Sequence, residues 1–147
     1  MEWGRLVVGS LLCGAVLFAV GVAFYLLTPL MAPWLAAEYR NEAVFRPWGG
    51  WTRAYMQAHP WLFGALFAGG FFGARASFCG ARLDGSWAGL LYGLAVFAVG
   101  GLPIYALNLA SFRVSAGVVV SWAVQSLGQY VLAGLALGWY CGRAGSP

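Results

Sequence analysis

The sequence predicts an all-α integral membrane protein, a four-helix bundle with glycine-rich helix packing, and three observations lead to that prediction. The 147 residues are 62% hydrophobic and only 8% charged, whereas a soluble domain carries roughly 25% charged residues. Four segments approach the ~20 apolar residues that a helix needs to cross a bilayer. Small residues recur four apart within these segments. With so little polar surface, a single transmembrane domain over residues 1–147 in contact with lipid is expected.

The four spans are expected at about residues 6–27, 61–79, 86–110 and 114–140. The first has too long an apolar core for a cleaved signal peptide, whose apolar region covers ~7–15 residues. The second begins after Pro60, because proline suits the first turn of a helix. Tryptophans near the ends of these segments support the boundaries, since indole rings prefer the headgroup level.

Residues 36–60 form the one sizeable loop that the sequence predicts between spans. Trp51 and Tyr55 are four residues apart and share a helical face. This spacing indicates a short amphipathic helix in the membrane interface, with a lid or docking surface as the alternative. An even number of spans places both termini on one side. The arginines divide evenly between the two sides, but the length of this loop and the positions of the cysteines favour cytoplasmic termini.

Small residues spaced four apart predict where the helices pack closely. Lipid gives helices no hydrophobic reason to associate, so close backbone contact through small side chains supplies the attraction. The second span carries such a run beginning at Ala65, and similar runs occur in the third and fourth spans. The predicted packing glycines are Gly14, Gly69, Gly73, Gly85, Gly89, Gly93, Gly134, Gly138 and Gly142.

Polar residues gather in the opposite leaflet from the glycine runs, which predicts a bundle that is tight at one end and splayed at the other. The candidate lining of a cleft there is Tyr25, Thr28, Tyr105, Asn108, Ser121, Gln125 and Gln129. The alternative is that these groups hydrogen-bond between helices and leave no cavity. In the fourth span the polar and glycine faces point in different directions, so a second copy or another membrane subunit can use one of them.

Catalytic chemistry is missing from the predicted bundle. Catalysis needs several titratable groups close together, and the chain has one histidine, His59, and one aspartate, Asp84. We therefore expect no enzyme activity, no metal site and no cofactor. Scattered arginines do not form a nucleic-acid surface. Arg75 is the one charge placed within a span, with Asp84 as a candidate partner; a position near the helix end lets it reach the interface.

The segments 102–114 and 121–134 resemble the second half of uncharacterised small four-helix bacterial membrane proteins. The resemblance implies a bacterial inner-membrane location and brings no activity with it. Two functions remain open from the sequence. One is a non-catalytic accessory or structural subunit that packs with itself or within a larger membrane complex. The other is a small oligomeric transporter, channel or lipid-binding protein that uses the polar cleft.

Overall fold

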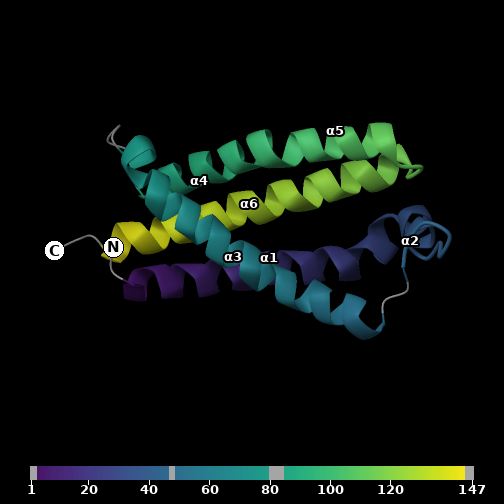
Figure 1. The fold of residues 1–147 in the computed structure, drawn as a ribbon, viewed down its shortest axis with the longest axis horizontal. Helices are drawn as coiled ribbons and strands as arrows, with labels where there is room; N and C mark the ends of the chain where they lie inside the picture. The colour runs from purple at the N-terminus through teal and green to yellow at the C-terminus, as the bar shows by residue number, and fades with distance from the viewer. Residues whose placement is uncertain (1–2, 47–48, 80–84, 145–147) are drawn as a thin grey trace.

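The computed structural model describes residues 3–46, 49–79 and 85–144, with the side chains of 75–79 and 144 left out. The chain is all-α, and Figure 1 shows long helices lying side by side. The elements are α1 (Trp3–Met31), α2 (Pro33–Tyr39), α3 (Gly50–Cys79), α4 (Gly85–Val96), a π-helical turn η1 (Phe97–Gly101), α5 (Leu102–Ser111) and α6 (Ala116–Ala144). Three helical stretches in the described part are long and apolar enough to span a membrane: Trp3–Met31, Gly85–Ser111 and Ala116–Arg143.

Helix α3 differs from the expected loop followed by a span at residue 61. It begins at Gly50, whose φ of 53° lies in the left-handed region that glycine tolerates, and continues through Pro60. Proline has no N–H to donate to the carbonyl of Met56, four residues earlier. The Nδ1 of His59 lies 3.1 Å from that oxygen and takes the place of the missing donor. The segment expected to form a separate interfacial helix is therefore the first part of α3.

The long helices alternate in direction. Figure 1 shows that α1 begins and α6 ends at the same end of the molecule, which we call the terminal end. Helix α3 packs mainly on α1, and α4 packs mainly on α6. Contact between α1 and α6 joins these two pairs. The short helix α2 lies at the other end, which we call the loop end.

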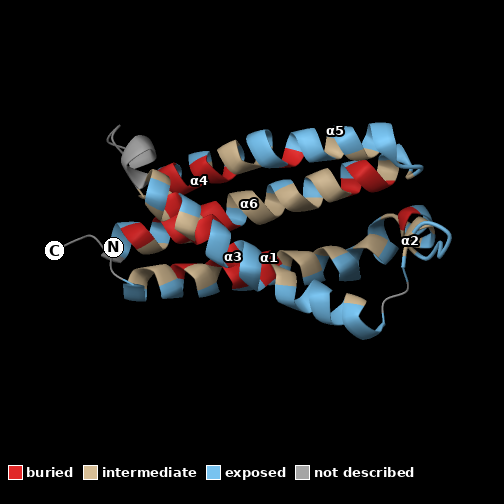
Figure 2. Ribbon diagram, viewed as in Figure 1, coloured by how far each residue is buried: buried red, intermediate tan, exposed pale blue. Residues whose placement is uncertain are grey.

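Burial concentrates toward the terminal end, as Figure 2 shows. The core cluster contains Cys13, Leu17, Phe67, Ala68, Phe71, Tyr92, Ala133, Leu137 and Cys141. These residues come from the first half of α1, the second half of α3, α4 and the second half of α6. Helix α5, by contrast, has no buried residue. The helices are thus packed tightly at one end and more loosely at the other, in the arrangement that the glycine and polar patterns predict.

The π-helical turn redirects the third long helix. It occupies Phe97–Gly101, two residues before Pro103. A π-turn contains one extra residue, which rotates the following side chains by roughly 100° relative to a regular helix. Glycines of α4 face α6 before the turn, and Tyr105 reaches Ser126 of α6 after it. The turn therefore lets α4 and α5 contact α6 in two ways: through glycines before the turn and through a hydrogen bond after it.

Candidate functional site

The closest helix contact in the described chain is between α4 and α6. A Cβ atom built on Gly85, Gly89 or Gly93 would fall within 3.0 Å of backbone atoms of α6. A Cβ on Gly134 or Gly138 would meet the backbone of α4 in the same way. Gly142, at the end of this row, has its nearest neighbour at 3.7 Å. Two glycine runs therefore face each other and allow backbone-to-backbone contact.

Helices α1 and α3 form a second close contact. A Cβ on Gly14 would lie 2.7 Å from the ring of Trp61 and 3.3 Å from its Cα. The opposing residue is Gly64, where a Cβ would be 2.7 Å from the Cα of Gly14 and 2.8 Å from the carbonyl oxygen of Ser10. Sequence reasoning missed Gly64 because it lies outside the run at Ala65, Gly69 and Gly73.

That run instead leaves one face of α3 open. A Cβ on Gly69 or Gly73 would have nothing within 4 Å among the described atoms. Ala65, one turn earlier, is exposed. Leu62 and Leu66 border the same face and are 61% and 65% exposed. The run therefore forms an open small-residue face with leucine side chains beside it, and no described helix covers that face.

The polar residues of α6 turn toward different neighbours. The Nε2 of Gln129 donates to the carbonyl oxygen of Leu17 in α1 at 2.8 Å. The Nε2 of Gln125 lies in the same region, 3.7 Å from the Cβ position of Gly21. Ser121 lies farther toward the loop end, where its Oγ is 2.7 Å from the hydroxyl of Tyr39 in α2. These side chains connect α6 to α1 and α2.

The other residues of the predicted cleft lie elsewhere. The hydroxyl of Tyr105 hydrogen-bonds Ser126, a residue that sequence reasoning did not select. Thr28 donates to the carbonyl of Phe24 in its own helix at 2.7 Å. Tyr25 is 61% exposed, and Asn108 is half-buried near the end of α5. The structure places the polar set along several helix contacts, and does not gather it around one cleft.

A hollow of about 200 Å³ lies between α1, α3 and α6. Its polar lining comes from His59, Ser126 and Gln129. Its apolar lining comes from Leu17, Pro60, Phe63 and Tyr130. Of the residues predicted to line a cleft, only Gln129 contributes to this hollow. His59 contributes because α3 begins well before Pro60, a feature that the predicted loop concealed.

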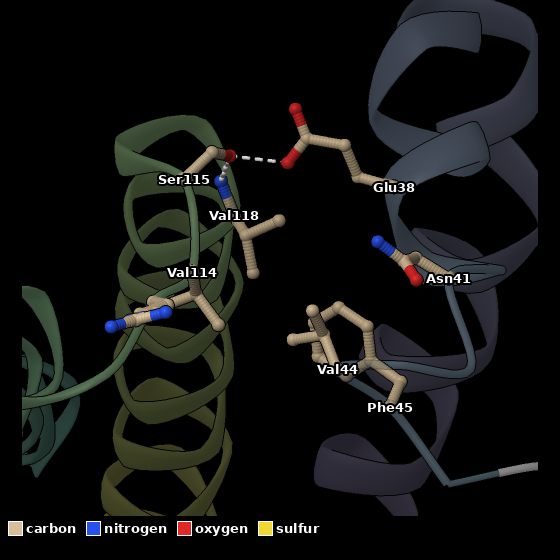
Figure 3. Close-up of a pocket in the computed structure, with 8 residues that line it drawn as sticks. Glu38, Asn41, Val44, Phe45, Val114, Ser115 and Val118 are labelled. Atoms are coloured by element: carbon tan, nitrogen blue, oxygen red, sulfur yellow. Dashed lines mark hydrogen bonds between the residues drawn. The ribbon is translucent and has the colours of Figure 1, made fainter.

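A second hollow, of about 210 Å³, lies at the loop end, where α2 and the following turn approach the start of α6. Figure 3 shows Glu38 and Asn41 on one side and Ser115 and Val118 on the other. Ser115 Oγ donates to the Glu38 carboxylate and accepts the N–H of Val118 at 3.2 Å. Ser115 is therefore the N-cap of α6. The capping serine thus also fastens α2 to α6.

Tyr39 reinforces this attachment. Ser121 donates to the carbonyl of Val118 at 2.7 Å, so the Tyr39 hydroxyl is the donor in its contact with Ser121. Phe45 packs between Tyr39 and Trp122, with ring centroids 5.4 Å and 6.2 Å away. Burial raises the pKa of Tyr39 above its ordinary value of 10.0, although the hydrogen bond with Ser121 acts in the opposite direction. The hydroxyl therefore remains a neutral donor throughout the physiological range.

Few groups in the described residues are arranged for metal or acid–base chemistry. No set of three or more histidine, cysteine or acidic side chains in that part of the chain could hold a metal ion. Cys13 and Cys141 are buried in the core cluster, and the side chain of Cys79 lies outside the description. Arg75 belongs to the last turns of α3. The side chain of Arg75 and the whole of Asp84 lie outside the described residues, so the pairing of these two residues stays a prediction.

Comparison of the chain with protein-family models, with curated proteins and with solved structures gives no match.

Proposed function

We propose that this chain is a non-catalytic integral membrane protein that serves as a structural or accessory subunit, packing with a second copy of itself through α3. The observation that carries the proposal is the open small-residue face formed by Ala65, Gly69 and Gly73. Small residues four apart let two helices approach closely in lipid. The runs in α4 and α6 are already paired with each other, whereas the run in α3 has no partner in the described chain.

A second copy is the preferred occupant because the run is self-complementary. Two α3 helices related by a two-fold axis would place the same glycines against each other, in the isologous manner of most symmetric dimers. Leu62 and Leu66 would then pack beside the crossing point. A helix from another subunit of a larger membrane complex is the other occupant that the same face accepts.

Membrane insertion involves all the long helices in this proposal, with α3 as the fourth crossing. Its residues Trp61 and Phe72 meet Gly14 and Gly9 of α1, so α3 runs antiparallel to α1 and packs against its first half. The common end of α1 and α6 in Figure 1 supports an even number of crossings. We further propose a bacterial inner membrane with both termini in the cytoplasm, on the basis of the loop length and the resemblance of residues 102–134.

The polar contacts support a packing role over transport. Gln129 bonds α1, Tyr105 bonds Ser126, and Tyr39 bonds Ser121. Hydrogen bonds of this kind hold membrane helices together at about 0.6 kcal/mol each. A transport path would need the same side chains to face a continuous aqueous passage.

The mass of the intact particle tests the proposal. The chain is extracted in mild detergent and its native mass is compared with that of Gly73→Leu, which fills the open face, and of Ala106→Leu on exposed α5. We expect a dimer for the wild type and for Ala106→Leu, and a monomer of unchanged helix content for Gly73→Leu. A monomeric wild type, or a Gly73→Leu particle of unchanged mass, would contradict assembly through α3.

A further inference from the structure

The hollow beside His59 lies near the middle of the bundle. Leu17 is the central residue of α1, which runs over Trp3–Met31. Gln129 and Tyr130 are at the centre of α6, Ala116–Ala144, and both line the same hollow. If these helices cross the bilayer, the hollow lies close to its midplane. This placement depends on the crossing of the membrane and is independent of the proposed dimer.

The His59 ring is held in one orientation. Its Nδ1 lies 3.1 Å from the carbonyl oxygen of Met56, and a carbonyl can only accept, so Nδ1 carries the proton. The ring stacks on Tyr55 with centroids 5.7 Å apart and an interplanar angle of 13°. It also meets the Phe63 ring at 6.0 Å and 81°. In the neutral imidazole, these contacts leave Nε2 as a hydrogen-bond acceptor for a ligand.

Hydrogen-bond donors come from α6. Gln129 uses one N–H on Leu17, and its second N–H and its oxygen remain available. Ser126 shares a hydrogen bond with Tyr105; when Tyr105 is the donor, the serine proton can point into the hollow. The hollow therefore combines one fixed acceptor on α3 with donors on α6. An ionisable residue at membrane depth is itself a mark of function.

Depth and size restrict the ligand. A charged or strongly hydrated molecule pays a high free-energy cost at the bilayer midplane. An apolar cavity of roughly 150 Å³ holds one benzene ring, so about 200 Å³ accommodates one substituted ring. Phe63 is 45% exposed, which opens the hollow to the outer surface of the bundle. A ligand could thus enter from lipid and leave an apolar tail outside.

We propose that this hollow binds the ring of a membrane-soluble quinol. One ring hydroxyl donates to Nε2 of His59, and the oxygen across the ring accepts from Ser126 or Gln129. The oxidised quinone has only carbonyl oxygens and cannot donate to Nε2, so the site prefers the reduced form. No electron transfer is involved: the proposal concerns binding alone.

Native mass spectrometry of the full chain tests this, with decylubiquinol under anaerobic conditions as the probe. We expect one adduct per chain, and binding of decylubiquinone weaker by about tenfold, the factor of one hydrogen bond. His59→Phe keeps an aromatic ring but removes Nε2, and should weaken decylubiquinol binding by a similar factor. Leu107→Ala on exposed α5 is the control that retains binding.

A second variant separates loss of binding from misfolding, since His59→Phe also leaves the Met56 carbonyl without its donor. The side-chain amide of His59→Asn can donate to that carbonyl as Nδ1 does, but it has no acceptor at the position of Nε2. Loss of the adduct in His59→Asn, at unchanged helix content, supports the site. An unchanged adduct in His59→Asn, equal binding of the oxidised and reduced probes, or adducts of phospholipid alone would overturn it. A monomeric wild type that binds decylubiquinol would contradict the α3 dimer and leave this site standing.

Discussion

Replacing Gly138 by alanine tests the closest helix contact of the fold. The added methyl group would meet the carbonyl oxygen of Gly85, would lie 2.8 Å from the carbonyl carbon of Gly85, and would lie 3.0 Å from the Cα of Gly89. All these atoms belong to the backbone of α4. A flexible side chain could rotate away from a new methyl group, but a helix backbone can respond only by moving as a whole. The substitution should therefore separate α4 from α6 around this point.

The expected cost follows from the number of close contacts. Overpacking a well-filled interior costs typically 1–3 kcal/mol, and contact with several backbone atoms places Gly138→Ala near about 3 kcal/mol on that scale. Helices of a membrane bundle persist when they separate in the membrane, so the higher helix propensity of alanine contributes little. A loss of ~3 kcal/mol corresponds to roughly a hundredfold change in the unfolding equilibrium.

The assay is reversible unfolding in mixed micelles with increasing denaturing detergent, followed by tryptophan fluorescence. Gly100→Ala is the matched control, because nothing lies within 4 Å of its added methyl group in the described chain and it lies outside the proposed α3 contact. We expect that control to unfold within about 0.5 kcal/mol of the wild type, as surface substitutions usually do. Equal stability of Gly138→Ala and Gly100→Ala would refute the close packing of α4 on α6.

Other substitutions test the polar contacts. Tyr39→Phe removes the donor to Ser121 and should cost about 1 kcal/mol in the same unfolding assay. Trypsin should also cleave faster after Arg40. Unchanged cleavage would argue against attachment of α2 to α6 through Tyr39. Ser115→Ala removes the N-cap of α6 and should also cost about 1 kcal/mol. A thermal melt followed by circular dichroism would detect this loss, and an unchanged melting temperature would argue against the cap. Gln129→Leu should cost only ~0.6 kcal/mol in that melt, and a loss above 2 kcal/mol would show that Gln129 does more than bond α1.

Glycine spacing predicted close packing in the third and fourth spans, but it did not predict that these two spans pack on each other. The runs at Gly85, Gly89 and Gly93 and at Gly134 and Gly138 are visible because a spacing of four keeps residues on one helical face. Spacing alone does not say which face meets which, and the similar run at Gly69 and Gly73 has no neighbour in the described chain. Only the path of the helices in space separates a paired run from an open one.

The start of α3 was the main error of the sequence reasoning. Polar residues such as Arg53 and Gln57, followed by Pro60, are typical of a loop that leads into a span. The helix continues because the Met56 carbonyl, which Pro60 deprives of its usual donor, accepts from the His59 ring. A side-chain N–H here takes the place of a backbone N–H, and the residue pattern does not reveal such a replacement because it depends on local geometry. The continued helix places His59 beside Gln129 instead of in a surface loop.

The predicted polar cleft shows a similar limit. Gln125 and Gln129 are one turn apart in α6, and both lie near Gly21 of α1. Leaflet assignment could not foresee that Thr28 would bond its own helix, or that the π-turn would direct Tyr105 to Ser126. A side chain can satisfy its hydrogen bonds in several directions, so polarity at a given depth predicts a contact without predicting its partner.

Cross-linking from residue 69 tests the central proposal, assembly through α3, most directly. Gly69→Cys is introduced together with Cys79→Ser, and native membranes are oxidised before extraction. Two α3 helices packed through this face would bring the paired Cα atoms within the ~4.4–6.8 Å that a disulfide spans. We predict a covalent dimer of this chain from Gly69→Cys and none from Leu107→Cys on exposed α5. Monomer alone from both variants, or equal dimer from both, would contradict the proposal.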